Sequence, residues 1–196
     1  MKRTGMLLLW MALCLHLSAQ TYRLTANDQR NLKEMAVQMV NRFQSNCRTI
    51  ADKNTPSSQV TCAGGVIDNT MKDFMEDARI EITSLDGKTT SNRKVKEYLY
   101  RLFRLRETRY SSIRISWYNV NVAENFTKDP NRPNLYVGEV TLVQRFSGVT
   151  HEGQVLEDQV RRKTKVYATP QEYRDKNTKK IRWIIKLGDI SAKTIQ

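Results

Sequence analysis

The chain has 196 residues, and residues 20–196, which follow a predicted leader, fit a single domain with its own hydrophobic core. No apolar run in this part approaches the roughly 18 residues needed to cross a bilayer, which argues against a membrane-spanning product. The formal net charge of +13 favours acidic partners such as acidic glycans, phosphate-rich lipid headgroups or nucleic acid, and it also suits a surface that is merely soluble.

The first nineteen residues are predicted to be a signal peptide. Lys2 and Arg3 give a positive start, the stretch 6–17 is almost entirely apolar, and Ala19 is the small residue before the expected cut. We therefore expect a secreted or periplasmic protein whose mature chain begins at Gln20. Its net charge falls from +13 to +11 through the loss of Lys2 and Arg3.

Two cysteines remain after the leader, Cys47 and Cys62. An even pair in an oxidising compartment typically forms a disulfide, and closing this short loop would stabilise the fold by about 3 kcal/mol. We therefore expect the two to be joined. The alternative is a nucleophilic cysteine activated by His151, the only histidine after the leader.

The period of the apolar residues predicts helices in the first half of the mature chain. A long amphipathic helix begins at a capping pair, Thr25 and Asp28, and ends near Asp52. A second, shorter helix over residues 67–78 runs directly into a strand over 79–84. A third helix is expected from about 92 to 106, and beyond it the period changes to two.

Four strand candidates fill the remainder of the sequence, and each is longer than the usual five or six residues. Such lengths favour a strongly bent sheet. A phase switch at Trp117 and Tyr118 predicts a β-bulge in the first of them. The four cover residues 111–122, 134–148, 157–169 and 180–192.

This order of elements resembles the NTF2-like (cystatin-like α+β) superfamily, as a secreted bacterial member. Two segments carry the resemblance: residues 74–82, where the second helix hands over to the first strand, and residues 181–190 of the last strand. The resemblance implies an α+β cone, in which a strongly curved antiparallel sheet of long strands wraps around N-terminal helices and leaves a pocket at the open end. Members include isomerases, dehydratases, hydrolases and proteins that only bind or assemble, so the fold implies no single function.

The catalytic groups typical of enzymes in this family are not recognisable in the sequence. Such enzymes place an Asp or His deep in the cone as a general base, with a Tyr or a second acid as hydrogen-bond donor. His151 lies in a predicted hairpin turn, and Asp73 and Asp77 lie on the solvent side of the second helix. We therefore predict no catalytic residue and no cofactor. One histidine and two bonded cysteines also predict no metal site.

Aromatic side chains are the candidates for lining a pocket. Tyr98, Trp117 and Tyr118 are the three that we select, although aromatics in such positions are often plain core.

Positive charge is concentrated on the third helix and on the third long strand, where Arg161, Lys163 and Lys165 share one face. A basic stripe with nearby tyrosines can bind a polyanion, and the alternative is a solvated outer face that resists edge aggregation. The candidate polyanion-binding residues are Arg101, Arg104, Arg106, Arg109, Arg161, Lys163, Lys165 and Arg182.

Together these features predict an exported, non-catalytic NTF2-like protein of the bacterial envelope that binds or assembles. Expected partners are an acidic glycan, lipopolysaccharide or another envelope protein, and a homodimer through the sheet face is a further option. The alternative is a small-molecule enzyme of isomerase, dehydratase or hydrolase type that uses the cone pocket. A buried acid or histidine in the cone would favour catalysis, whereas basic residues of helix and sheet converging on one face would favour polyanion binding.

Overall fold

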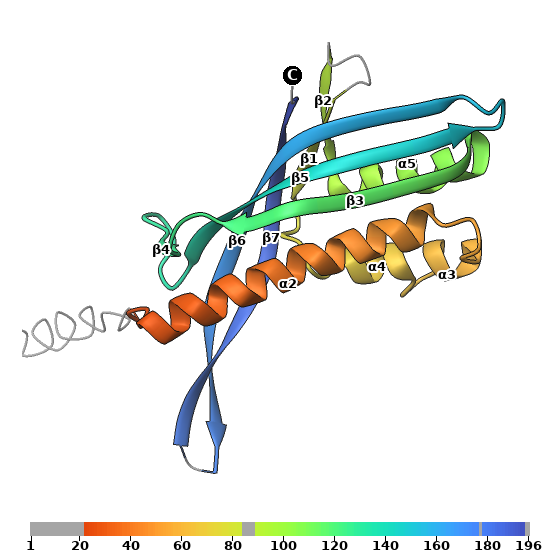
Figure 1. Cartoon of the computed structure of the whole chain (residues 1–196). Helices are drawn as coiled ribbons and strands as arrows, with labels where there is room; N and C mark the ends of the chain where they lie inside the picture. The colour runs from red at the N-terminus through yellow and green to blue at the C-terminus, as the bar shows by residue number, and fades with distance from the viewer. Residues whose placement is uncertain (1–21, 84–88, 177, 195–196) are drawn as a thin grey trace, which may run out of the picture.

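The structure, a computed structural model, describes residues 22–83, 89–176 and 178–194. The predicted leader, residues 1–19, lies outside this part of the chain. Figure 1 shows one long, strongly curved sheet that arches over a set of helices.

The helices begin and end where local sequence signals place them. The longest, α2 (Ala26–Ala51), starts with a capping box in which the backbone N–H of Asp28 donates to the Thr25 hydroxyl and the Asp28 carboxylate accepts from the Thr25 backbone. Its start and its end near Asp52 agree with the prediction. The other helices are α3 (Ser57–Thr61), α4 (Val66–Met71) and α5 (Val95–Thr108).

The sheet has the strand order β2-β1-β7-β6-β5-β3, with the short β4 paired to β5. All neighbouring strands are antiparallel except β1 and β7, which meet in parallel at Ile80 and Ile190. The strands are β1 (Arg79–Thr83), β2 (Thr90–Lys94), β3 (Tyr110–Val122), β4 (Thr127–Lys128), β5 (Tyr136–Thr150), β6 (Val155–Asp175) and β7 (Thr178–Thr194).

The core lies between the inner face of this curved sheet and the helices. Phe43 of α2 contacts Phe74 edge-on, with ring centroids 4.9 Å apart, and Leu187 of β7 is fully buried among the same residues. The arrangement is an α+β fold in which helices pack in a strongly curved sheet, as the resemblance implies, so the predicted fold class is confirmed; the one difference is that β1 and β7 are parallel.

Two predicted helix boundaries are wrong and one short helix was not predicted, each for an identifiable reason. The second helix stops at Met71 because the following backbone bonds to β7 instead: the Leu187 N–H donates to Asp73, and the Met75 N–H donates to Leu187, each at 2.8 Å. Residues 92–94 belong to β2, whose mostly exposed side chains carry no apolar alternation. The short helix α3 lies in a stretch whose polar composition predicts a loop.

The predicted bulge in β3 exists, one step further along the chain. The register with β5 shifts between Tyr118 and Asn121, and Asn119 between them has a φ of 54°. A positive φ is uncommon for a non-glycine residue, although asparagine tolerates it, and here it coincides with the local disruption of the ladder.

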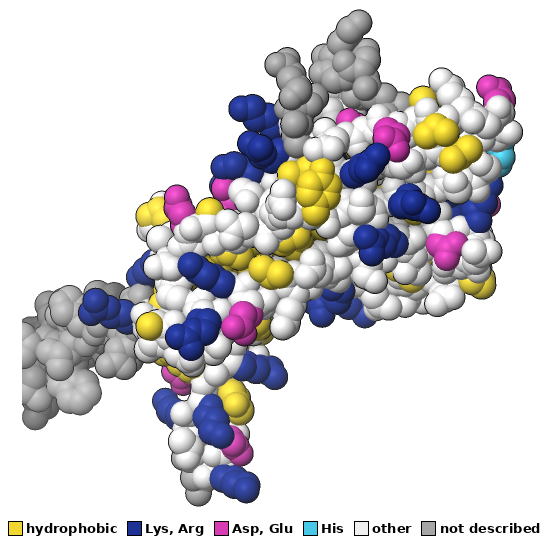
Figure 2. Space-filling view, in the orientation of Figure 1, with side chains coloured by type: hydrophobic (Ala, Val, Ile, Leu, Met, Phe, Trp, Pro, Cys, Tyr) yellow, Lys and Arg dark blue, Asp and Glu magenta, His cyan; other side chains and the backbone are white. Residues whose placement is uncertain are grey.

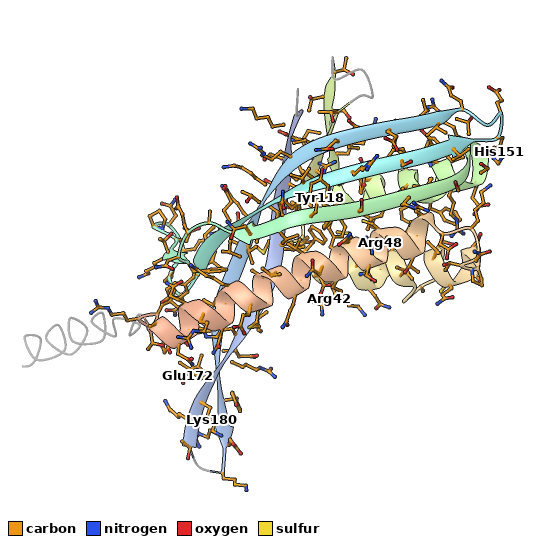
Figure 3. All side chains as sticks on the ribbon, viewed as in Figure 1. Arg42, Arg48, Tyr118, His151, Glu172 and Lys180 are labelled. Carbon is orange, nitrogen blue, oxygen red and sulfur yellow. The ribbon has the colours of Figure 1, made fainter. Side chains whose placement is uncertain are left out.

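The β6–β7 hairpin extends well beyond the cone. Past Ala168, β6 pairs with no strand but β7 among the described residues, and the two form a ribbon that ends near Asp175 and Thr178. Figure 3 labels Glu172 and Lys180 on this projecting ribbon. None of the helices in the described ranges is both long enough and apolar enough to span a membrane.

Asp28 joins the start of α2 to the sheet, and we expect Asp28→Ala to lower the free energy of unfolding by about 1–2 kcal/mol at neutral pH. Its carboxylate accepts hydrogen bonds from the Tyr22 hydroxyl at 2.8 Å and from the indole of Trp183 at 3.1 Å, besides those from Thr25. Chemical denaturation measures the loss, and Glu34→Ala, an exposed change on the same helix, serves as the control.

The loss should depend on pH. Burial acts to raise the Asp28 pKa, but hydrogen bonds from Thr25, Tyr22 and Trp183 outweigh it and lower the pKa below the ordinary value of 3.8. The stabilisation is therefore fully present above that value and disappears as the pH falls through the lower folded-state pKa. A destabilisation that stayed constant down to the most acidic pH would contradict this role for the carboxylate.

Candidate functional site

The cone holds a cavity of about 300 Å³ between α5 and the inner faces of the strands. Its apolar wall consists of Ile82, Leu102, Leu105, Tyr110 and Phe146. The Tyr110 ring lies directly over the backbone of Gly148, where a Cβ atom would approach within 2.6 Å of the ring, so glycine at this position lets the aromatic wall form. The rings of Tyr110 and Phe146 meet edge-on at 5.6 Å.

The polar lining is dominated by a buried arginine. Arg162 is 3% exposed, and its Nε donates to Oε1 of Gln144 at 2.7 Å while Nη1 donates to the backbone carbonyl of Glu81 at 2.8 Å. No carboxylate forms an ion pair with it within the described ranges. The remaining polar residues of the lining are Thr83, Tyr98, Arg101, Arg109 and Asp158.

Strand alternation explains why an arginine lies inside. Successive residues of β6 point to opposite faces, so Arg162 shares the inner face with buried Val160 and Val166, and the half-buried Asp158 lies on it as well. Burial lowers the pKa of the Arg162 guanidinium and raises the pKa of the Asp158 carboxyl, because each loses water around its charged form. Burial likewise raises the pKa of the Tyr98 hydroxyl, which lies next to Gln144.

The three predicted pocket residues are separated in the structure. Tyr98 lines the cavity. Trp117 packs edge-on against Phe43 in the core at 5.2 Å, and Tyr118, on the next position of β3, is 38% exposed. The prediction for Trp117 and Tyr118 is therefore wrong, because neither belongs to the cavity lining.

The acidic residues and the histidine noted in the sequence lie away from the cavity lining. Asp73 forms a two-pronged ion pair with Arg42 of α2, with both distances 2.7 Å, and Asp77 lies 3.7 Å from the Lys94 ammonium. His151 is in the β5–β6 turn, as predicted, and its backbone N–H donates to the Arg109 carbonyl at 3.3 Å. Figure 3 shows His151 at this tip and Arg42 on α2. Within the described ranges, no cluster of three or more His, Cys, Asp or Glu side chains could hold a metal ion.

The predicted basic surface is divided into separate parts. Arg161, Lys163 and Lys165 are exposed on the outer face of β6, and Lys163 pairs with Glu139 at 2.8 Å. Figure 2 shows Lys and Arg side chains scattered over the face in view, with acidic side chains among them. Arg101 and Arg104 project from α5, which packs on the opposite, inner side of the sheet. The helix and the strand therefore do not present one footprint.

Arg182 also lies apart, on the projecting ribbon. It donates to Oε1 of Gln171 at 2.7 Å, and its ladder position lies about 33 Å along β6 from Arg161, since a strand rises roughly 3.3 Å per residue. Arg182 therefore does not join Arg161, Lys163 and Lys165 in one binding surface.

Arg106 does not belong to any binding surface, which corrects the sequence prediction. It is 1% exposed, because it falls on the buried stripe of α5 with Leu99 and Leu102. Its guanidinium donates to the Ile50 carbonyl at 3.2 Å and to the carbonyl of Asp52. Arg106 thus satisfies the end of α2, and its role is structural.

The disulfide expectation is not met either. Cys47 is fully buried and Cys62 is exposed at the end of α3, and both are free thiols in the structure. Cys47 lies on the inward face of α2, on the same side as Tyr98 and Arg162 of the cavity. Its thiol is close enough to influence the pKa values of both groups. Cys62 lies on the outer surface and does not meet it.

Sequence reasoning missed the most informative residues of the cavity, Arg162, Asp158 and Gln144. A signal for the first two was available in the alternation of β6. If Arg161, Lys163 and Lys165 point outward, then Arg162 and Asp158 must point inward, and a charged residue at a core position is unusual enough to mark a site. Gln144 carried no such signal.

Comparisons with solved structures find several similar chains, and the following three all share low identity with this one. A candidate aromatic ring hydroxylase from Novosphingobium aromaticivorans shares 14% identity over 84% of this chain and 90% of that one, with a TM-score of 0.46. A candidate scytalone dehydratase from the same species shares 7% identity over 83% and 85%, with a TM-score of 0.43. An NTF2-like protein of unknown function from Exiguobacterium sp. 255-15 shares 8% identity over 80% and 98%, with a TM-score of 0.42.

Likenesses at this level carry no argument about activity. No protein family model matches the sequence, and no curated protein matches it at a significant level. The function is therefore inferred from the residues of the cavity itself.

Proposed function

We propose that this protein binds a small organic anion in the cone cavity and serves as a non-catalytic binding protein of the bacterial envelope. The observation that carries the proposal is the guanidinium of Arg162, which is 3% exposed at a 300 Å³ cavity with no ion-pair partner among the described residues. A pocket of this size accommodates a small ligand.

The cost of burying this charge supports a ligand of opposite sign. Removing an ion from water costs several kcal/mol unless a charged partner and further hydrogen bonds offset it. Gln144 and the Glu81 carbonyl occupy Nε and Nη1 of Arg162, while Nη2 has no hydrogen-bond partner within the described part of the chain. A ligand carboxylate would accept from Nη2 in a charge-assisted hydrogen bond, and the Tyr98 hydroxyl lines the same space.

The rim of the cavity favours the approach of anions. Arg101 and Arg109 belong to the lining and are exposed, so their charges reach solvent at the mouth of the cavity. Clustered positive charge at the mouth of a cleft raises the local concentration of an anion and its association rate.

The test compares Arg162→Met with the wild-type protein, using galacturonate, gluconate and benzoate as probes in titration calorimetry. Loss of a charge-assisted hydrogen bond should weaken binding by at least about tenfold. Arg162→Lys keeps the charge without the planar fork and should fall between the two. Arg161→Met, on the neighbouring outward position, is the matched control and should bind as the wild type does.

Circular dichroism separates loss of binding from loss of fold in these variants. Equal affinity in wild type and a folded Arg162→Met protein would contradict the proposal. So would a wild-type protein that binds none of the three probes.

A catalytic role is the second candidate, and Asp158 is the observation that favours it. This half-buried carboxyl lies in the cavity lining with its pKa raised by burial, which is a property of general bases. Under the binding proposal, NMR spectra of the probes should stay unchanged after prolonged incubation with the protein. Consumption of a probe that Asp158→Asn abolishes would instead establish an enzyme.

The envelope location rests on the predicted leader. N-terminal sequencing of protein recovered from the periplasm or medium should begin near Gln20. A cytoplasmic product that retains residues 1–19 would contradict this part of the proposal.

A further inference from the structure

A second and larger hollow runs along the outer side of α5. It has a volume of about 870 Å³ and is lined by Arg93 and Lys94 at the end of β2 and by Lys96, Arg101 and Arg104 of α5, with Tyr100 among them. We call this hollow the α5 groove. Five basic side chains line it and only one acid, Glu97, so the lining carries a net positive charge.

Three of these five charges are not neutralised by neighbouring acids. Lys94 and Lys96 form ion pairs with aspartates at 3.7 and 3.2 Å. Arg93, Arg101 and Arg104 form no ion pair within the described ranges, and the Nε of Arg93 is buried without a hydrogen-bond partner there. The groove therefore offers three arginines to an anionic ligand.

The α5 groove and the cone cavity meet at α5. Arg101 and Leu105, one helical turn apart, line both hollows. Tyr98 lines only the cavity, and Arg104 lines only the groove, so a ligand that leaves the cavity past Arg101 reaches Arg104 directly. The Cβ atoms of residues three apart on a helix are about 5–6 Å apart, close to the length of one sugar ring.

The chemistry of the cavity suits a sugar acid at the end of such a ligand. Arg162 would bind a carboxylate, and Gln144 and Asp158 would bind hydroxyl groups. Arg162 and Asp158 lie four positions apart on the inner face of β6, so their Cα atoms are about 13 Å apart, which leaves room for one ring between the side chains. The rings of Tyr110 and Phe146 would cover its apolar face.

We propose that the ligand is an acidic oligosaccharide whose terminal uronic acid occupies the cone cavity and whose next carboxylates lie on Arg101, Arg104 and Arg93 in the α5 groove. This inference rests on the proposed function for the cavity and adds the groove to it. A nucleic acid fits less well, because Tyr100 is the only aromatic residue in the groove lining described and successive bases need stacking partners.

The test measures affinity for galacturonate and for its α-1,4-linked dimer, trimer and hexamer by titration calorimetry. Affinity should rise with chain length and fall steeply with added salt for the longer chains, since groove contacts are exposed charges. Arg104→Glu should leave galacturonate binding unchanged and weaken hexamer binding by at least about tenfold. Arg101→Glu should weaken both. Arg161→Glu, an equal charge reversal on the outer sheet face, should change neither.

The outcomes separate the groove from the cavity. A hexamer that binds no tighter than galacturonate, or hexamer binding insensitive to Arg104→Glu, overturns the groove while leaving the Arg162 cavity intact. Hexamer binding that depends on Arg104 but not on Arg162 overturns the proposed cavity function instead. Single-stranded DNA or lipid A vesicles that bind more tightly than the hexamer, with the same dependence on Arg104, overturn the assignment to a glycan.

Discussion

Replacing Arg106 by methionine is expected to lower the free energy of unfolding by about 3–5 kcal/mol. The guanidinium is buried and donates hydrogen bonds to two other helices, namely to the carbonyls of Ile50 and Asp52 at the end of α2 and to the Ser57 hydroxyl at the start of α3, the last at 3.2 Å. It also donates to its neighbour Glu107 on α5 at 2.8 Å. Methionine fills similar space but leaves the buried Ile50 carbonyl without a donor, which costs about 1–3 kcal/mol. The part-buried acceptors on Asp52, Ser57 and Glu107 keep access to water, and each loses a hydrogen bond from a charged donor.

Chemical denaturation of both proteins measures this loss. The matched control is Arg104→Met, which lies two positions away on the exposed side of α5 and should change stability by no more than about 0.5 kcal/mol. Equal stability of the Arg106→Met and Arg104→Met proteins would show that the buried hydrogen bonds contribute nothing net.

The contrast between Arg104 and Arg106 shows what the sequence can and cannot predict. Both were candidates for a charged surface, and the apolar stripe of Val95, Leu99 and Leu102 continues with helical spacing to 106 but not to 104. The pattern therefore contained the information that 106 faces the core. The pattern did not show which groups the Arg106 guanidinium binds, since only the packing of α2 against α5 brings the end of α2 within its reach.

The fold was largely predictable because long amphipathic segments bury one face wherever they occur. The period of three to four residues defined α2, and the period of two defined β3, β5, β6 and β7. Short elements were not predictable in the same way. β2 and α3 bury few side chains, and their positions depend on backbone pairing with β1 and on the turn that follows α2.

The site was less predictable because it depends on side chains brought together from distant parts of the chain. Gln144 and Arg162 are on different strands, and the Glu81 carbonyl that orients Arg162 belongs to a third. Alternation places Arg162 on the inner face with Asp158, but only the three-dimensional arrangement shows that its guanidinium forms no ion pair with an acid among the described residues. The same holds for the cysteines, since a disulfide needs Cβ atoms within about 4.5 Å and sequence spacing does not supply that distance.

In the native protein, Cys62 should react with a thiol reagent such as dithionitrobenzoate while Cys47 stays protected. Burial raises the pKa of the Cys47 thiol from 9.0 to about 12, which lowers its thiolate fraction at mildly alkaline pH by about a thousandfold. Its full burial adds the need for local unfolding before any reagent can reach it. Cys62 is exposed and carries no such barrier.

The native protein should therefore release one equivalent of chromophore rapidly and the second only in denaturant. Cys62→Ser should remove the fast phase, and Cys47→Ser should leave it intact. The thiolate of Cys47 would become appreciable only as the pH approaches its raised pKa, so the slow phase should remain slow throughout the neutral and mildly alkaline range. A native protein that releases no chromophore, and whose intact mass is two hydrogens below the reduced mass, would mean that the cysteines are joined after export and that α2 or α3 moves to allow it.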